Sequence, residues 1–245
     1  MTLNGWIQII FYLVVLVALV KPLGLYMAKV YQGERTFLSP VLGLQERLIY
    51  RLGGIDPQQE MVWKVYTFAV LLFSVIGYIF LYLLQRLQGF LPLNPLGLGA
   101  VSPDLSVNTS AGFITNTNWQ NYGGESTLSY LTQMVGLTVQ NFVSAAAGIA
   151  ILVAFIRGFT RANTRNLGNF WVDLTRSTVH ILLPLAIVLA LVSQGVVQTH
   201  NPSATATLIQ PTTGSNNQAV TSQTIAVGPL ASQIAIKQLG TNGGG

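Results

Sequence analysis

The chain has 245 residues, of which 51% are hydrophobic and only 8% are charged, and it contains no cysteine. About a quarter of the residues in soluble domains are charged, so this sequence has too few charges to cover a water-facing surface. The lack of cysteine excludes disulfides, thiolate metal sites and a cysteine nucleophile. The formal net charge of +5 is compatible with nucleic-acid binding. The positions of the basic residues along the chain test this alternative.

Four apolar segments have about the length that a membrane-spanning helix needs. They are residues 3–20, 65–84, 128–156 and 178–197. The first, which stops at Lys21-Pro22, is the weakest because Asn4 and Gln8 interrupt it. A signal peptide is the alternative for this segment. However, it has no basic start and no small-residue cleavage site, so we expect a retained transmembrane helix.

The basic residues are concentrated in two of the loops between these segments. Ten of the twelve lie there: Lys21, Lys29, Arg35, Arg47, Arg51, Lys64, Arg157, Arg161, Arg165 and Arg176. Such loops face the cytoplasm, so the N-terminus and the loops 85–127 and 198–245 are expected outside. The positive charge therefore reports membrane topology, and we expect no nucleic-acid partner.

The first cytoplasmic loop and the last outer loop differ in pattern. The stretch VLGLQERLIYRLGGI, residues 41–55, has apolar residues near helical spacing and a Gly53-Gly54 stop signal. It predicts a short amphipathic helix that lies at the membrane surface or against a partner. Residues 198–225 are rich in Ser and Thr and show no hydrophobic period. They predict a solvated, mobile loop.

The outer loop 85–127 contains a candidate re-entrant hairpin. Ser102 or Asp104 can begin a helix of about ten residues, which is too short to span a bilayer. The polar tract TNTNWQ, residues 115–120, follows this helix. Non-helical backbone at membrane depth is tolerated where it is packed in protein or lines a water-filled cavity. An ordinary turn rich in Asn and Thr is the alternative interpretation.

Such a hairpin would bind an ion through its backbone carbonyl oxygens. The oxygens of residues 114–117, from Ile114 to Thr117, can replace the hydration shell of an alkali cation. Carboxylates, which divalent ions usually need, are absent from the tract, since Asp104 precedes the helix and Glu125 follows the tract. The tract therefore favours a monovalent cation.

A second tract near the C-terminus repeats this arrangement. Pro229 can open a short helix, which leads into Gly-Thr-Asn-Gly-Gly-Gly at 240–245. Both tracts contain Thr-Asn, both lie on the outer side, and each follows an apolar segment and a short helix. The pattern indicates an internal repeat of segment, pore helix, filter strand and segment.

Several motifs together resemble the KdpA family, the potassium-binding subunits of the Kdp potassium-transporting ATPase. They are KPLG at 21–24, PLNP at 92–95, TNTNWQ at 115–120, GGESTLSYLTQMVGLTVQNFVSAAAGIA at 123–150, GNFWVDLTR at 168–176 and GPLASQIAIKQLGTNGGG at 228–245. The resemblance covers the whole chain. It implies an all-α polytopic membrane protein of the potassium-transporter superfamily, with helix–pore helix–helix repeats around one pore. It also implies a bacterial inner-membrane location and assembly with KdpB, a P-type ATPase subunit, and with KdpC and KdpF.

The resemblance divides the chain into five parts. These are an extra N-terminal helix (1–27), a cytoplasmic loop with an amphipathic helix (28–62), a first repeat (63–157), a cytoplasmic loop (158–176) and the first half of a second repeat (177–245). The potassium filter is expected at Ile114, Thr115, Asn116, Thr117, Asn118, Gln120, Gly240, Thr241, Asn242, Gly243, Gly244 and Gly245. The family has four repeats around the pore and this chain has at most two, so it is expected to be a fragment or to be completed by another polypeptide.

Two other functions are weighed against an ATP-driven importer: a passive or ion-coupled transporter of the Trk/Ktr class, and a non-conducting assembly protein. No catalytic constellation is visible, so we expect a transport subunit that binds potassium but no ATP. Within the third segment, Gln133, Gln140 and Asn141 are expected to bond between helices or to line the path below the filter. His180 is expected to be an interfacial packing residue. Lys237 is expected to point aside from the pore into a polar contact.

Overall fold

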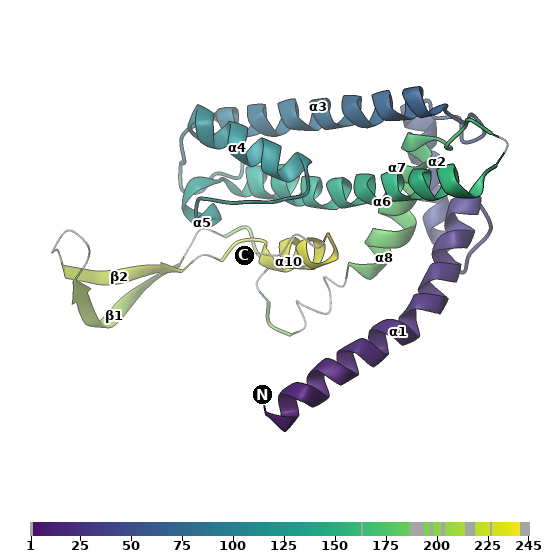
Figure 1. The fold of residues 1–245 in the computed structure, drawn as a ribbon. Helices are drawn as coiled ribbons and strands as arrows, with labels where there is room; N and C mark the ends of the chain where they lie inside the picture. Colours follow the sequence, from purple (N-terminus) through teal and green to yellow (C-terminus); the bar gives the residue numbers. More distant parts are fainter. Residues whose placement is uncertain are drawn as a thin grey trace.

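The computed structural model describes residues 2–162, 164–186, 194–196, 198–201, 204–213, 219–225 and 227–240. Within these ranges the chain is mainly helical, as the sequence predicts, and holds one small two-stranded sheet (Figure 1). Three of the described helical stretches are long and apolar enough to cross a membrane: Leu3–Gln32, Trp63–Phe90 and Thr132–Thr160. They correspond to the first three predicted segments.

Helix α1 (Leu3–Gln32) continues beyond the hydropathy boundary at Lys21-Pro22 and includes Pro22 in its interior. A proline removes only one backbone donor, and long apolar helices tolerate this loss. The helix stops at Gly33, whose φ of 76° lets its N–H reach the carbonyls of Lys29 and Val30.

Helix α2 (Ser39–Gly53) confirms the predicted amphipathic helix and its glycine stop. Pro40 lies in its first turn, where a missing N–H costs nothing, and Gly54 ends it with a φ of 61°. It packs against α7 (Phe170–Arg176), and its axis is steeply inclined to α3 (Trp63–Leu87) and α6 (Val139–Thr160) in Figure 1.

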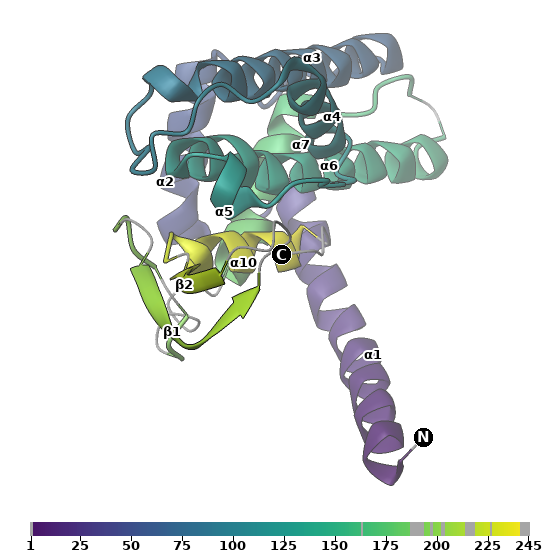
Figure 2. The same ribbon diagram turned by 90° about the vertical axis from the view of Figure 1, so that its left-hand side faces the viewer.

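The hairpin between α3 and α6 contains the predicted pore helix. A 3₁₀ turn (Gln88–Phe90) ends α3, and α4 (Pro103–Ile114) then runs back against α3 and α6 (Figure 2). After the short helix α5 (Gly124–Thr127), the chain enters α6 through the π-helical turn η2 (Thr132–Thr138). Small side chains of α6, such as Ala147 and Ala150, let α3 and α7 pack closely against it.

The fourth predicted segment is described only in part. Helix α7 (Phe170–Arg176) starts within the stretch expected to be a loop, where Asn169 caps it by accepting from the N–H of Trp171. It continues as the π-helical turn η3 (Ser177–Leu182) and as α8 (Leu183–Leu185). Residues 187–193 and 197 of this segment lie outside the described residues.

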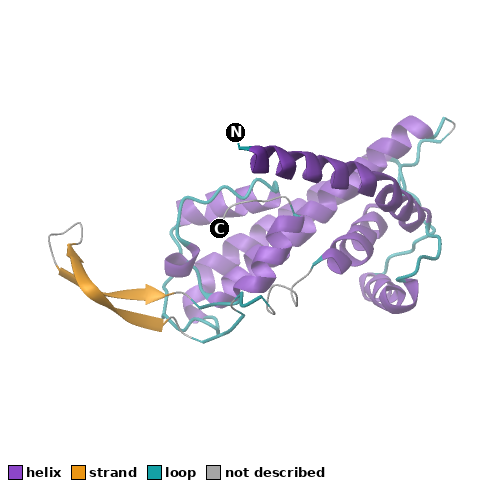
Figure 3. Cartoon of the chain, turned by 90° about the horizontal axis from the view of Figure 1, so that it is seen from below, coloured by secondary structure: helices purple, strands orange, loops and turns teal. Residues whose placement is uncertain are grey.

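Residues 198–225, predicted to be a solvated, mobile loop, contain two exposed strands that the sequence did not predict. Strands β1 (Ala204–Thr213) and β2 (Ala219–Ile225) form an antiparallel hairpin that extends away from the helices (Figure 3). Alternating Ala and β-branched Thr favour extended backbone, but without an apolar face they give no hydrophobic period. A register shift between Thr207 and Thr212 accommodates Pro211, which cannot donate to a ladder.

The predicted second short helix is α10 (Leu230–Leu239), which follows Pro229. It packs against α6 and η2, on the side of α6 opposite α3 and α4 (Figures 1 and 2). Helix α6 therefore lies between the two short helices whose polar tracts form the candidate site.

Candidate ion-binding site

The first tract reverses direction at the end of α4. The hydroxyl of Thr115 donates to the carbonyl of Ala111 at 2.9 Å. The N–H groups of Thr117 and Asn118 both donate to the carbonyl of Gly112, each at 2.9 Å. These bonds close the last turn of α4 and fold the following backbone against it.

The tract places two asparagines in left-handed backbone conformations. Asn116 has a φ of 57° and Asn118 a φ of 53°. Asparagine tolerates this region better than other residues with a Cβ. Because φ is positive at 116 and 118 and not at the residue between them, successive peptide groups do not follow a helix or a strand. The tract is an irregular backbone segment, as the hypothesis of a filter requires.

A side chain joins the two tracts. The Nδ2 of Asn116 donates to the carbonyl oxygen of Gly240 at 3.2 Å, and its Oδ1 accepts from the hydroxyl of Ser144 at 3.0 Å. Ser144 lies on α6, and Gly240 is the buried residue that follows α10. The ends of α4 and α10, which are far apart in sequence, thus meet beside α6.

The end of α4 is also fixed from the side of α3. A Cβ on Gly77 would come within 2.7 Å of the Cδ1 of Ile114. The missing side chain at Gly77 therefore makes room for the residue that precedes the tract. Of the other predicted filter residues, Thr115 and Thr117 are exposed, and Thr241, Asn242, Gly243, Gly244 and Gly245 lie outside the described residues.

Several buried amide atoms near the tract have no hydrogen-bond partner among the described residues. They are both amide atoms of Asn118, the Nε2 of Gln140 and the Oδ1 of Asn141. Leaving such atoms unpaired costs about 1–3 kcal/mol each. Partners from outside the described residues, or a hydrated ion path, would remove this cost.

The remaining polar residues of the prediction have different surroundings. Gln133 donates to the carbonyls of Gly124 and Leu128 at 3.0 and 3.1 Å, so it ties the α5 loop to η2. Gln120 donates to the hydroxyl of Tyr122 at 3.1 Å. The expected polar contact of Lys237 is not found among the described residues, in which this side chain is buried.

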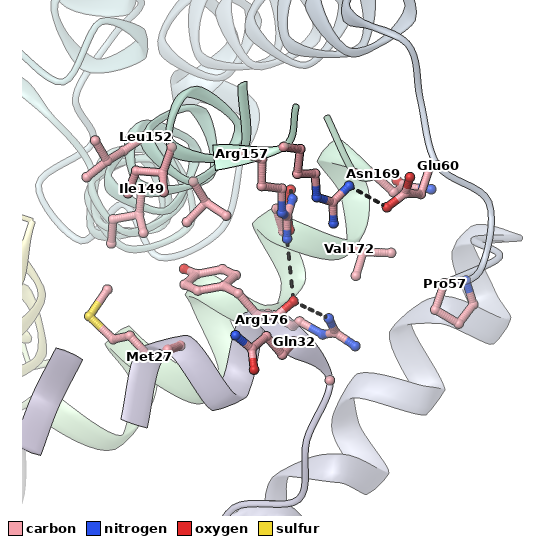
Figure 4. A pocket seen from close by; sticks show the side chains of 18 of the residues that line it. Met27, Gln32, Pro57, Glu60, Ile149, Leu152, Arg157, Asn169, Val172 and Arg176 are labelled. Atoms are coloured by element: carbon pink, nitrogen blue, oxygen red, sulfur yellow. Dashed lines mark hydrogen bonds and ion pairs between the residues drawn. The ribbon is translucent and has the colours of Figure 1, made fainter. Parts of the chain in front are cut away.

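A second polar region lies at the opposite, predicted cytoplasmic end, where α1, α6 and α7 line a cavity of about 810 Å³ (Figure 4). Arg157 forms a bidentate ion pair with Asp173 at 2.6 and 2.9 Å. The hydroxyl of Tyr66 donates to the same carboxylate at 3.2 Å. Both Arg157 and Arg176 also donate to the carbonyl of Tyr31 near the end of α1, at 3.4 and 3.3 Å.

Glu46 continues this charged network onto α2. It accepts from Arg176 at 3.1 Å and from Tyr50 at 2.7 Å, and it contacts the Nε2 of His180 at 2.9 Å. Burial alone would raise the pKa of Glu46, but its hydrogen bonds with His180, Tyr50 and Arg176 lower that pKa to about 2. His180 is therefore not a simple packing residue, because its ring bonds to a carboxylate that the prediction did not pair with it.

The contact of Ser144 with the first tract was not predicted from the sequence. The ion pairs that Glu46 and Asp173 form with arginines of other helices were not predicted either. Nothing in the sequence sets Ser144 apart from the other small residues of α6. A signal did exist for Asp173, which lies within the apolar stretch FWVDLTR. A lone carboxylate in such a stretch needs a cation close by, and Arg157 lies in the last turn of the preceding long apolar helix.

Comparison with known proteins identifies the family of the chain as a whole. A family model described as the potassium-transporting ATPase A subunit, KdpA, matches residues 10–245. The chain belongs to the KdpA family. A KdpA relative from Sorangium cellulosum is 62% identical over 247 residues, which is 100% of this chain and 43% of that relative.

Two further relatives give the same result. The protein of Herpetosiphon aurantiacus is 62% identical over 99% of this chain and 42% of its own length. A protein of Methylorubrum extorquens is 59% identical over 100% of this chain and 42% of its own length. All three bear the name potassium-transporting ATPase potassium-binding subunit. This KdpA chain thus spans less than half the length of the curated relatives that it matches.

Proposed function

We propose that this chain is part of a potassium-binding and translocating membrane subunit of an ATP-driven, high-affinity potassium importer. The observation that carries the proposal is the bond from the side chain of Asn116 to the carbonyl of Gly240, at 3.2 Å. It brings together the ends of two short helices whose tracts both contain Thr-Asn. A filter built from several chain segments needs such a meeting point.

The ion would be selected by backbone oxygens. Residues 114–118 and 240–245, with Gln120 beside the first tract, would replace water around a dehydrated potassium ion. Within the described residues, no group of three or more His, Cys, Asp or Glu side chains could hold a metal ion. Neutral oxygen ligands suit a large monovalent cation better than a small divalent one.

The arrangement in the membrane follows from the same proposal. The protein would lie in a bacterial inner membrane with its N-terminus outside, and the basic loops would face the cytoplasm. Residues 1–27 would be the extra helix, 63–157 a complete repeat and 177–245 the first half of the next. The loops 28–62 and 158–176 would connect these parts on the cytoplasmic side.

The relatives' name places them in an ATPase, but it does not say which polypeptide hydrolyses ATP. We propose that hydrolysis occurs on the KdpB subunit and that KdpC and KdpF complete the complex. This chain would then bind neither ATP nor nucleic acid and would have no catalytic site of its own. A passive transporter of the Trk/Ktr class is the competing proposal, and potassium uptake that is indifferent to ATP would favour it.

The proposal is tested by replacing Asn116 with alanine in the assembled transporter that contains this chain. Loss of the bond to Gly240 should loosen the junction of the two tracts and raise the potassium concentration for half-maximal transport. The substitution removes this bond and the bond from Ser144 to the same side chain. Each is worth about 1 kcal/mol, so a rise of at least about fivefold is expected. Potassium-dependent ATP hydrolysis of the purified complex measures it.

The matched control is Asn108→Ala, which removes the same side chain from an exposed position on α4. It should leave the potassium dependence unchanged. If Asn116→Ala also leaves it unchanged in a complex that assembles normally, the first tract is not part of the ion path. Gln120→Ala provides a second test of that path and should again raise the potassium concentration required.

A further inference from the structure

Helix α2 carries an unpartnered apolar stripe on its surface. Val41, Leu44, Leu48 and Leu52 are 68%, 65%, 54% and 79% exposed. Their spacing of three and four residues places them on one side of the helix. We call these four residues the α2 stripe. An apolar row of this kind, left in water, would be costly, so something apolar is expected to cover it.

The stripe cannot rotate inward, because the other side of α2 is already fixed. Glu46 bonds to Arg176 and His180 of the α7–η3 helix, and Tyr50 donates to Glu46. Leu42 and Tyr50 are buried on the same side. The apolar stripe therefore stays directed away from these packed residues.

The position of α2 fits the surface of a bilayer. The helix connects α1 and α3, two helices long enough to span the membrane, at their predicted cytoplasmic ends. It packs against α7 and η3, and its axis is steeply inclined to α3 and α6 in Figure 1. Trp63 and Lys64 begin α3, with the ammonium 5.6 Å from the indole ring, and Trp is enriched at the lipid–water interface. A helix held at this level can lie in the plane of the interface.

Two exposed arginines lie beside the stripe. Arg47 and Arg51 follow Leu44 and Leu48 by three residues, so each is adjacent to the stripe on the helix surface. Neither forms an ion pair with any described residue. The one carboxylate of α2, Glu46, is turned away and paired. The rim of the stripe therefore presents positive charge without a matching negative group.

We propose that α2 is an interfacial anchor: the α2 stripe inserts into the cytoplasmic leaflet, and Arg47 and Arg51 bind the phosphates of anionic lipids. An apolar row with a cationic rim is the pattern of helices that lie in the membrane interface. Anionic lipid supplies both parts of the complementary surface, acyl chains for the leucines and phosphate for the guanidinium groups. This proposal does not depend on the proposed path for potassium.

A spin-label scan of the assembled transporter in anionic liposomes tests the insertion. Single labels at positions 41 to 52 are compared for collision with oxygen, which concentrates in lipid, and with a polar nickel reagent, which stays in water. At positions 41, 44, 48 and 52, oxygen collisions should be several-fold more frequent than nickel collisions. At positions 46 and 50, collisions with both reagents should be rare.

Two results of the scan would overturn the proposal. Low accessibility to both reagents at the stripe positions would show that a protein surface covers them. Nickel accessibility at these positions as high as that of an exposed loop label would show that they remain in water. Either pattern in a complex with normal ATPase activity excludes the lipid as the occupant.

Lipid selectivity tests the arginines separately. A fluorophore at position 48 is quenched with brominated phosphatidylglycerol or brominated phosphatidylcholine, and the ratio of quenching gives the preference for anionic lipid. A basic residue near an anionic surface favours binding by up to about fivefold. Arg47→Gln with Arg51→Gln should therefore reduce a several-fold preference to near one.

Arg165→Gln is the matched control, because Arg165 is an exposed arginine of the other cytoplasmic loop, outside α2. It should keep the preference of the unchanged protein. The proposal fails if the double variant keeps that preference, or if the unchanged protein shows none. High salt should weaken the preference, since exposed charges are screened.

Discussion

The two polar regions of this chain use opposite chemistry. At one end of the helices, predicted to be the outer one, the junction of α4, α6 and α10 is made by neutral groups, with Asn116 between Ser144 and Gly240. At the opposite end, charged groups dominate and are paired, as in the ion pair of Arg157 with Asp173. Among the described residues, the buried amides near the first tract keep atoms without a hydrogen-bond partner, whereas the carboxylate of Asp173 accepts bonds on both oxygens.

The difference corresponds to two physical tasks. A buried charge is tolerated only when it is paired, and the pairing then fixes the helices that carry it. A site that must exchange a cation cannot hold it by fixed carboxylates without slowing its release. Neutral dipoles with spare acceptors can bind a cation weakly enough to let it leave. Under the proposed function, the paired charges would keep one end of the helices rigid, and the neutral groups at the other end would bind the cation.

The largest loss of stability is expected from removing the carboxylate of Asp173. Asp173→Ala leaves the guanidinium of Arg157, whose side chain is 13% exposed, without its partner. Breaking a buried pair costs about 3–5 kcal/mol of unfolding free energy. Thermal unfolding of the purified complex in detergent measures the change.

The control for Asp173→Ala is Glu60→Ala, which breaks a pair with Arg161 whose side chains are 40% and 37% exposed. An exposed pair of this kind contributes about 0.2–1 kcal/mol. If the two variants unfold at the same temperature, the cytoplasmic end does not depend on its buried charge.

A somewhat smaller effect is expected at Gly168, which lies beside the same ion pair. Its φ is 97°, and a Cβ there would collide with the guanidinium of Arg157. Gly168→Ala should therefore cost about 2 kcal/mol or more, through strain and through displacement of the arginine. The unfolding temperature again provides the measurement.

Gly54→Ala is the control that separates backbone strain from displacement of the Arg157 side chain. Gly54 also has a positive φ, 61°, but no atom lies within 4 Å of the position of its missing Cβ. Only the backbone cost of about 1–2 kcal/mol should remain. A loss in Gly168→Ala no greater than that in Gly54→Ala would mean that the arginine moves aside freely.

The neutral junction should respond more weakly. Ser144→Ala removes the bond to the Oδ1 of Asn116, worth about 1 kcal/mol. It should raise the potassium concentration for half-maximal ATPase activity by a few-fold and lower the unfolding temperature only slightly.

Ser74→Ala is the comparison for this variant, because the Ser74 hydroxyl donates to the carbonyl of Val70 within its own helix. It should change neither quantity. A large stability loss in Ser144→Ala without a change in potassium dependence would contradict the proposed division between a rigid end and an adaptable end.

The sequence predicted one of these regions better than the other. Apolar segments and the short helix before TNTNWQ followed from hydropathy and turn chemistry, because both depend on neighbouring residues. The charged network did not, since Glu46 and Arg176 are 130 residues apart and no local pattern connects them. In the sequence, Arg157 and Arg176 were used only as indicators of membrane topology. Their ion pairs were therefore not predicted.

The β-hairpin and the π-helical turns were missed for related reasons. The strands at 204–213 and 219–225 are paired by backbone bonds with no apolar face, so the hydrophobic period had nothing to detect. The turns η2 and η3 lie where helices meet other elements. Turns of this kind often occur at functional positions, and packing decides them rather than local preference.

The last prediction concerns the attachment of α2 and depends on pH. The pKa of Glu46 is about 2 in the folded protein against an ordinary value of 4.5. A carboxyl with a lowered pKa stabilises the fold fully above its ordinary pKa, and this contribution is lost as pH falls toward the folded value. The stabilisation by Glu46 should therefore be complete at a pH well above 4.5 and should decline between about 4.5 and 2.

The measurement is the difference in unfolding temperature between the unchanged protein and Glu46→Gln at each pH. Subtraction removes the effect of the other carboxyl groups, so the difference should be largest above pH 4.5 and should shrink steadily below it. Glu34→Gln, at an exposed position after α1, should change the unfolding temperature little throughout. A difference for Glu46→Gln that stays constant as pH falls would show that α2 is held by its apolar contacts alone. The charged network would then end at Arg176 and would not include α2.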